Sequence, residues 1–220
     1  MEETNLAPLR CLIFDIDGTL VNTSPLIVKL YQNLFLKHKK IKTSLEDIIA
    51  TFGPPEEQII ATHFSDNQNE ALEYFLEEYE RQHPETSYLS REELISLRAK
   101  GYLLTIFTGK GRDSLDITLK KLNLHDCFDF AVCGSDVPRS KPYPDGLQKI
   151  IETVKLKREQ FLLIGDSPLD VVAARGADIR VAGVLWGTVE EEKLRAAEPD
   201  YLFEEPHSFL QWLNNQVSPS

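Results

Sequence analysis

Five apolar runs of strand length recur along the chain, and stretches with the apolar spacing of a helix lie between them. Within each run the apolarity is continuous rather than alternating, which is typical of strands that are buried on both faces of a parallel sheet. The repeated order of strand and helix predicts a doubly wound, Rossmann-like α/β sheet. The predicted strands lie in residues 9–17, 103–109, 128–134, 161–166 and 181–187.

Local signals support the helices between these strands. Ser90 is followed three residues later by Glu93, a capping-box spacing that begins the helical stretch ELISLRAK, and Gly101 indicates where that helix ends. Leu115 and Leu119 fall on one face of the next predicted helix. Each of these helices therefore has an apolar face that can pack on the sheet.

The segment between the first two predicted strands breaks this order. It contains two amphipathic stretches, PLIVKLYQNLFLKH and EALEYFLEEYERQ, and no convincing strand. Pro25 suits the first position of a helix that follows Ser24, and the sequence FGPP at 52–55 indicates a turn between helices. We therefore predict an α/β core domain from residues 1–20 and 86–220, with a helical domain inserted at residues 21–85.

Small and acidic polar residues stand where three of the predicted strands end, and a lysine stands in a loop before a predicted helix. In an open parallel sheet the ligand site lies at the carboxyl ends of the strands, so we expect these residues to converge on one crevice. They are Asp15 and Asp17 in DIDGT, Thr108 and Gly109 in FTGK, Asp166 in GDSPLD, and Lys141 in SKPYP.

This set of residues suits phosphoryl transfer. Mg²⁺ takes carboxylate oxygens and retains some of its waters, and Asp15, Asp166 and Asp170 can supply such oxygens. An ionised Asp15 beside the metal can attack phosphorus and form an aspartyl-phosphate. Asp17, two residues further along, is expected on the same side of the strand end, where it can protonate the leaving group and later deprotonate water.

The phosphoryl oxygens also need positive partners. Thr108, the backbone N–H of Gly109 at a predicted helix start, and the ammonium group of Lys141 can provide them. Together with the three aspartates, these residues predict a site for a phosphate ester and a magnesium ion.

Each signal also has a simpler structural explanation. DxDG is typical of turns and of calcium-binding loops, Thr108-Gly109 can merely begin a helix, and Lys141 can be a solvated loop charge. Asp170 forms an S-x-x-D capping arrangement with Ser167, which leaves helix capping and metal binding equally open for it. The four motifs in one order are a stronger signal than any one of them.

The motifs DIDGT, FTGK, SKPYP and GDSPLD, in this order, resemble the four motifs of the haloacid dehalogenase superfamily, and the resemblance spans nearly all of the chain. It is strongest to the small phosphatases that are similar to phosphoglycolate phosphatase. The resemblance implies that the helical insert is a mobile cap, which closes over the site and selects the substrate.

The same resemblance implies a role for each motif residue. Asp15 would be the nucleophile and a metal ligand, and Asp17 would be the general acid/base, with its backbone carbonyl on the metal. Thr108 and Lys141 would bind phosphate. Asp166 would be a further metal ligand, whereas relatives use the position of Asp170 either on the metal or behind it.

Asp17 favours phosphate chemistry, because the dehalogenase and phosphonate-cleaving branches of the superfamily characteristically lack this second aspartate. The expected activity is Mg²⁺-dependent hydrolysis of a small phosphate monoester. A phosphosugar mutase is an alternative, but such mutases tend to place an arginine in the cap loop, where TFGPPEEQ has acids and no arginine. A silent, phosphometabolite-binding regulatory protein is another alternative, and the presence of Asp15 and Asp17 favours an active enzyme over it.

Charge and composition exclude several other classes of protein. The formal net charge of −11 and the pI near 5.0 disfavour nucleic acid as a partner, and no apolar stretch approaches the length of a membrane span. The three cysteines, Cys11, Cys127 and Cys133, lack the spacing of a zinc site or a disulfide framework. Since the N-terminal residues resemble no targeting peptide, we expect a cytoplasmic monomer or homodimer that acts on a small phosphorylated metabolite. Phosphoglycolate, pyrophosphate and sugar or nucleoside monophosphates all remain open as substrates.

Overall fold

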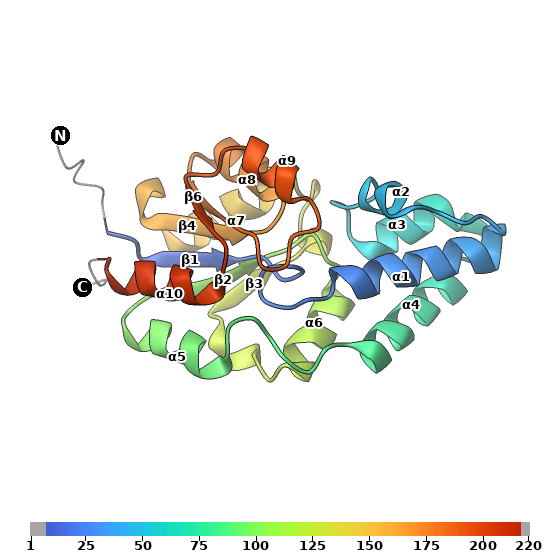
Figure 1. Ribbon diagram of the computed structural model, residues 1–220, viewed down its shortest axis with the longest axis horizontal. Coiled ribbons are helices and arrows are strands. Elements are labelled where there is room, and N and C mark those ends of the chain that lie inside the picture. The colour runs from blue at the N-terminus through green and yellow to red at the C-terminus, as the bar shows by residue number, and fades with distance from the viewer. Residues whose placement is uncertain (1–7, 217–220) are drawn as a thin grey trace.

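The computed structural model describes residues 8–216. Six parallel strands form one sheet in the order β3-β2-β1-β4-β5-β6 (Figure 1). The first five confirm the strands predicted from the sequence, and the sixth is a short strand at the edge of the sheet. The strands are β1 (Cys11–Phe14), β2 (Leu103–Phe107), β3 (Phe130–Val132), β4 (Phe161–Gly165), β5 (Arg180–Val184) and β6 (Tyr201–Phe203).

Strand β1 lies in the middle of the sheet, between β2 and β4. Residues 11–14 align with 103–106 on one side and with 161–164 on the other. The chain builds β2 and β3 on the first side and β4, β5 and β6 on the second, so the strand order reverses next to β1. In sheets of this type the reversal opens a ligand crevice at the carboxyl ends of the strands.

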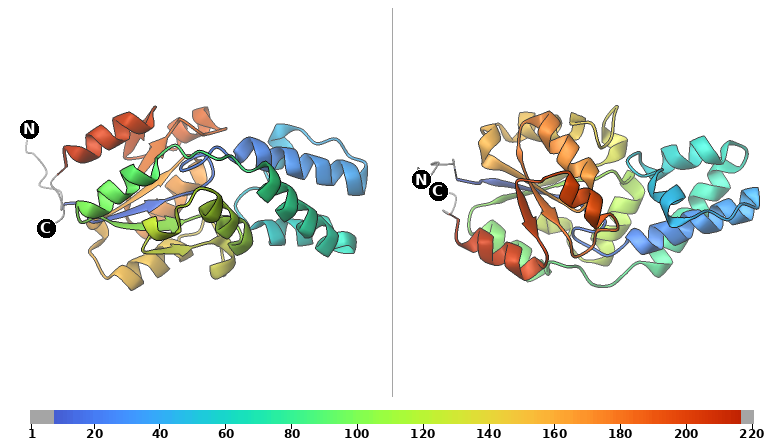
Figure 2. Two further views of the ribbon diagram at one scale, coloured as in Figure 1. Left: turned by 90° about the horizontal axis from the view of Figure 1, so that it is seen from below. Right: turned by 45° about the horizontal axis from the view of Figure 1, so that its top comes forward.

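Helices cover both faces of the sheet and confirm the doubly wound fold (Figures 1 and 2). Residues of α5, α6 and α10 pack on one face, and residues of α7, α8 and α9 pack on the other. These helices are α5 (Arg91–Ala99), α6 (Arg112–Lys121), α7 (Asp145–Val154), α8 (Pro168–Ala177), α9 (Glu191–Ala196) and α10 (Pro206–Asn214).

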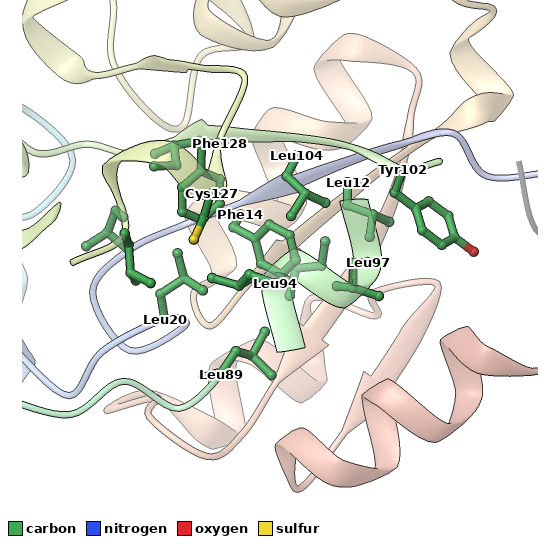
Figure 3. Packing of buried hydrophobic residues seen from close by; sticks show 14 of the residues in the cluster. Leu12, Phe14, Leu20, Leu89, Leu94, Leu97, Tyr102, Leu104, Cys127 and Phe128 are labelled. Atoms are coloured by element: carbon green, nitrogen blue, oxygen red, sulfur yellow. The ribbon is translucent and has the colours of Figure 1, made fainter. Parts of the chain in front are cut away.

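Alternate residues of β1 belong to opposite faces, as the pleat of a strand requires. Leu12 and Phe14 belong to the cluster under α5, α6 and α10, whereas Cys11 and Ile13 belong to the cluster under α7, α8 and α9. Figure 3 shows Phe14 among the leucines of the first cluster. Its ring also meets those of Phe128 and Phe209 edge to face, at centroid distances of 6.2 and 6.4 Å.

The segment between β1 and α5 folds as a helical insert, which we define as helices α1 to α4. These helices lie beyond one end of the sheet (Figures 1 and 2) and pack around a third apolar cluster, in which the rings of Tyr31 and Phe75 are 5.1 Å apart. A cluster separate from the two under the sheet supports the proposed division into a core and an inserted domain. The helices are α1 (Ser24–Leu34), α2 (Leu45–Ile49), α3 (Glu56–His63) and α4 (Gln68–Gln82).

Several local predictions can be compared with the structure. The capping box at the start of α5 is present, since Ser90 Oγ accepts the Glu93 N–H and a Glu93 carboxylate oxygen accepts the Ser90 N–H. Helix α1 begins at Ser24 itself, one residue earlier than predicted. The three cysteines are buried free thiols. Among the described residues, each helix is too short or too polar to cross a membrane.

Phe14 provides a test of the core. We expect Phe14→Ala to lower the free energy of unfolding by about 3–5 kcal/mol, because it removes a fully buried ring that packs against Phe128 and Phe209 and leaves a cavity. The matched control is Val172→Ala in α8, where the side chain is 50% exposed and a change within about 0.5 kcal/mol is expected. Urea unfolding followed by circular dichroism measures both, and equal losses in the two variants would contradict this account of the core.

Candidate active site

The carboxyl ends of three neighbouring strands bring together most of the residues predicted for the site. Asp15 and Asp17 follow β1, Gly109 follows β2 and Asp166 follows β4. Lys141 reaches the same place from the loop before α7, as its ion pair with Asp15 shows. The sheet therefore assembles at one edge side chains that lie up to about 150 residues apart in the sequence.

Three carboxylates form the centre of this group. One oxygen from each of Asp15, Asp166 and Asp170 lies within 4.8 Å of the other two, and all three residues are buried. Lys141 Nζ lies 3.0 Å from Asp15 Oδ1 and 2.5 Å from Asp170 Oδ1. Its ammonium group thus partly balances the negative charge of the cluster.

Burial and mutual repulsion perturb these carboxylates. Burial, together with the charges of Asp170 and Asp17, raises the pKa of Asp15 to about 6 against the opposing effect of Lys141. Burial, together with the charges of Asp15 and Asp170, also raises the pKa of Asp166 well above its usual range. The cluster therefore carries more negative charge than its lysine can balance.

Asp166 is held by the turn that follows β1. Thr19 Oγ1 donates a hydrogen bond to Asp166 Oδ1 at 3.2 Å. Gly18 has a φ of +77°, and a Cβ there would lie 2.1 Å from Asp166 Oδ2. Glycine at this position thus permits both the backbone turn and the close approach of the carboxylate.

Asp17 has buried partners of its own. Its Oδ1 lies 3.2 Å from Lys110 Nζ and accepts a hydrogen bond from the Thr23 hydroxyl. Lys110 is itself buried, and its ammonium group lies 4.2 Å from the ring centroid of Tyr79 in α4. Asp17 is therefore fixed by one residue of the core and by a second that leads into the helical insert.

Lys110 is a site residue that the sequence analysis missed. It stands beside Gly109 in FTGK, at the end of a predicted strand, and this position was the available signal. A lysine in a polar turn is usually solvated, whereas here its side chain is 4% exposed.

Thr108 and Gly109 differ in their relation to the site. Gly109 lines the cavity described below, but helix α6 begins only at Arg112, so the prediction that Gly109 opens a helix was wrong. Thr108 is buried and its hydroxyl accepts the Lys110 N–H at 3.3 Å. Thr108 therefore supports the turn that presents Gly109 and Lys110.

Asp170 combines the two arrangements that were left open for it. Its Oδ2 accepts the Ser167 N–H at 3.1 Å, which completes a capping box at the start of α8. Its Oδ1 faces Lys141 inside the carboxylate cluster. The residue is thus both a helix cap and a charged neighbour of Asp15.

The donor set fits a hard divalent cation. Carboxylate oxygens are the ligands that Mg²⁺ and Ca²⁺ prefer, and the three in this cluster are close enough to share one ion. Burial and the neighbouring carboxylates raise the pKa values of Asp15 and Asp166, and a bound cation would favour their ionised forms.

A cavity of about 1060 Å³ opens above these residues. Asp15, Asp17 and Lys141 lie at its core end, and residues of α1, α2, α3 and α4 line the opposite side. Glu56, the first residue of α3, lines it although it is 6% exposed. The burial of this acid could not be predicted from the sequence, because it depends on the packing of the insert on the core.

Comparison with known proteins agrees with the fold and the motifs. The sequence profile described as "Haloacid dehalogenase-like hydrolase" matches residues 12–184. A pyrophosphatase PpaX of Bacillus mycoides is 30% identical over 215 residues, covering 92% of this chain and 95% of its own length.

Solved structures show the same architecture. A hydrolase from Pseudomonas syringae has a TM-score of 0.76 and 25% identity, covering 96% of this chain and 100% of its own. A predicted phosphoglycolate phosphatase from Haemophilus somnus has a TM-score of 0.79 at 22% identity, covering 94% and 99%, and shows the shared fold. Since the matching profile covers all the strand ends that carry the motifs, this chain belongs to the haloacid dehalogenase-like hydrolase family.

Proposed function

We propose that this chain is a Mg²⁺-dependent phosphatase that hydrolyses a small phosphate monoester through an aspartyl-phosphate on Asp15. The observation that carries the proposal is the position of Asp15, a buried carboxylate that lines the cavity 3.0 Å from Lys141 Nζ. A nucleophile, a carboxylate cluster for a cation, and an ammonium group for phosphoryl oxygens thus meet at one point.

Asp15 and Asp166 are the proposed side-chain ligands of Mg²⁺, with the backbone carbonyl of Asp17 as a further ligand. Asp170 already pairs with Lys141 and accepts the Ser167 N–H, so its proposed role is to hold Lys141 in place beside Asp15. When bound, Mg²⁺ would neutralise charge on the phosphoryl oxygens.

The chain's own residues supply the other parts of the reaction. The ionised Asp15 attacks phosphorus, the bond between phosphorus and the leaving oxygen breaks, and Asp17 gives that oxygen a proton. Asp17 then takes a proton from water, the water oxygen attacks phosphorus, and inorganic phosphate leaves Asp15. Lys141 and the backbone N–H of Gly109 bind the phosphoryl oxygens in both steps, and Thr108 supports the turn that carries Gly109.

Pyrophosphate is a second candidate substrate, because the Bacillus mycoides relative is named as a pyrophosphatase. Hydrolysis of pyrophosphate would need the same nucleophile and cation as hydrolysis of a monoester. Pyrophosphate differs from a monoester in presenting a second phosphate to the insert side of the cavity. A phosphosugar mutase would also need a site for a second phosphate there, and the acidic lining of that side disfavours one.

The first prediction concerns the nucleophile. We expect Asp15→Asn to lower Mg²⁺-dependent hydrolysis of p-nitrophenyl phosphate by about 10³-fold or more, because an amide cannot form the covalent intermediate. Steady-state release of p-nitrophenolate measures the loss. Asp178→Asn is the matched control, since Asp178 is exposed in the turn after α8 and should retain wild-type activity. Turnover that survives in Asp15→Asn would exclude Asp15 as the nucleophile.

The second prediction concerns the general acid/base. p-Nitrophenolate leaves readily without a proton, so Asp17→Asn should still form the aspartyl-phosphate but should hydrolyse it slowly. Rapid mixing should show a burst of about one equivalent of p-nitrophenolate per enzyme, followed by turnover about 10²-fold or more below wild type. The double variant that also carries Asp15→Asn should show no burst. A wild-type steady-state rate in Asp17→Asn would contradict the proposed role.

The third prediction concerns pH and metal. The pKa of Asp15 is about 6 in the folded protein and near the usual value of about 3.9 when unfolded. The folded state therefore binds more protons, so this group lowers the free energy of unfolding as pH rises from 4 through 6. Between pH 5 and 7.5 the loss should be on the order of 1 kcal/mol in chelated protein.

Urea unfolding at pH 5 and 7.5, with EDTA and then with Mg²⁺, measures this effect. Mg²⁺ should recover stability mainly at pH 7.5, because it binds the ionised carboxylates. Chelated Asp15→Asn should lose less stability than wild type over the same interval. Identical pH dependence in the two proteins would contradict the assignment of the raised pKa to Asp15.

A further inference from the structure

Glu56 belongs to the helical insert but is packed against the core. The loop before it approaches the catalytic loops closely, since a Cβ at Gly53 would lie 2.8 Å from the carbonyl oxygen of Lys141. Glu56 Oε2 accepts the backbone N–H of Gly111 at 2.8 Å, next to the start of α6. The carboxylate therefore has a fixed position at the boundary between the insert and the core.

The charge of Lys110 acts on Glu56, but the second oxygen of the Glu56 carboxylate lacks a hydrogen-bond partner among the described residues. Glu56 Oε1 is buried and has no hydrogen-bond partner within residues 8–216, and Glu56 is among the residues that line the cavity. Burying a carboxylate oxygen without a donor is unfavourable, so native proteins usually satisfy such a group. A donor on a molecule in the cavity would satisfy it.

The charges near Glu56 restrict what that molecule can carry. The cavity is lined by further acids, from α2 of the insert and from the start of α9 in the core, while its lysines are already paired: Lys193 lies 2.6 Å from Glu190 and Lys110 lies 3.2 Å from Asp17. A second phosphate or a carboxylate placed there would meet like charges. The additional acids are Glu46, Glu190, Glu191 and Glu192.

The neighbouring acid has a different environment. Glu57 Oε1 accepts a hydrogen bond from Ser135 Oγ of the core, and Glu57 is not among the cavity-lining residues within the part of the chain described. Glu56 and Glu57 thus both link the insert to the core, but only Glu56 also faces the cavity. Glu57 can therefore serve as a control for the role of holding the insert against the core, because only Glu56 is also placed to bind a ligand in the cavity.

We propose that Glu56 is a specificity-determining residue, whose buried carboxylate accepts a hydrogen bond from a hydroxyl or ammonium group on the leaving-group part of the substrate. This inference rests on the proposed phosphatase function and deepens it. The preferred substrates are then small phosphate monoesters whose leaving group carries a hydrogen-bond donor. Pyrophosphate and phosphate esters with a carboxylate on the leaving group are disfavoured.

The test compares kcat/KM for a panel of phosphates in wild type, Glu56→Gln and Glu57→Gln. Phosphoethanolamine presents an ammonium group and glycerol 3-phosphate presents hydroxyls, whereas phosphoglycolate and pyrophosphate present a second anion. In wild type we expect kcat/KM for phosphoethanolamine or for glycerol 3-phosphate to exceed kcat/KM for both phosphoglycolate and pyrophosphate. In Glu56→Gln the ratio of kcat/KM for that preferred substrate to kcat/KM for phosphoglycolate should fall by about 10-fold or more, because the charged hydrogen-bond acceptor is lost.

Control variants separate specificity from simple loss of packing. Glu57→Gln should keep the wild-type ratio, and Glu56→Asp, which retains the charge, should stay closer to wild type than Glu56→Gln. A larger effect on phosphoethanolamine than on glycerol 3-phosphate identifies the donor as an ammonium group, and the reverse identifies a hydroxyl. Equal loss on all substrates in Glu56→Gln would overturn the inference, since a purely structural contact has that result.

Two outcomes distinguish failure of the inference from failure of the proposed function. Wild type that hydrolyses p-nitrophenyl phosphate with Mg²⁺, but prefers phosphoglycolate or pyrophosphate, would overturn the role of Glu56 alone. Wild type that hydrolyses neither p-nitrophenyl phosphate nor any phosphate of the panel would overturn both.

Discussion

The balance of buried charge at the carboxyl edge of the sheet determines how the rest of the site is arranged. Lys141 lies between Asp15 and Asp170, and Lys110 lies against Asp17, so each of the two proposed catalytic carboxylates, Asp15 and Asp17, has a buried ammonium group beside it. Removal of either lysine would leave an uncompensated charge in a poorly solvated place. Even with both lysines, burial and repulsion raise the pKa values of Asp15 and Asp166. The two lysines therefore balance the charge of the site only in part, and a bound cation would reduce the remaining repulsion.

The helical insert is connected to this charge balance by direct contacts. The ring of Tyr79 in α4 lies against Lys110, and Glu56 at the start of α3 binds the backbone of Gly111. Thr23, at the point where the chain enters α1, donates to Asp17. Movement of the insert away from the core would remove the aromatic ring from Lys110 and expose its ammonium group to solvent. Because Lys110 is what Asp17 pairs with, the geometry of the proposed acid depends on where the insert lies.

The sequence predicted those features that depend on short segments or on strand order. Five strands, the capping box at Ser90 and the convergence of Asp15, Asp166 and Lys141 follow from local patterns combined with the rule that parallel strands share one carboxyl edge. Lys110 and Glu56 were not predicted, because their burial depends on packing between segments distant in the sequence. The start of α6 was placed too early, since Gly109 and Gly111 are equally plausible helix beginnings in FTGKGR. Contacts between the insert and the core carry no signature in a single sequence.

The contrast between short motifs and long-range packing also explains why family membership indicates the type of reaction better than it indicates the substrate. The proposed nucleophile, general acid and phosphate-binding groups stand in short motifs at strand ends and in one adjoining loop, whereas the overall identity to the Bacillus mycoides relative is 30%. The rest of the cavity is lined by the helices of the insert and by residues 188–193 at the start of α9, where one acid or base can alter which leaving group is accepted. A pyrophosphatase and a monoester phosphatase can therefore share the core chemistry and differ in a few charges facing it. In this chain most of those charges are acidic, and the buried carboxylate of Glu56 is held against the core by the backbone N–H of Gly111.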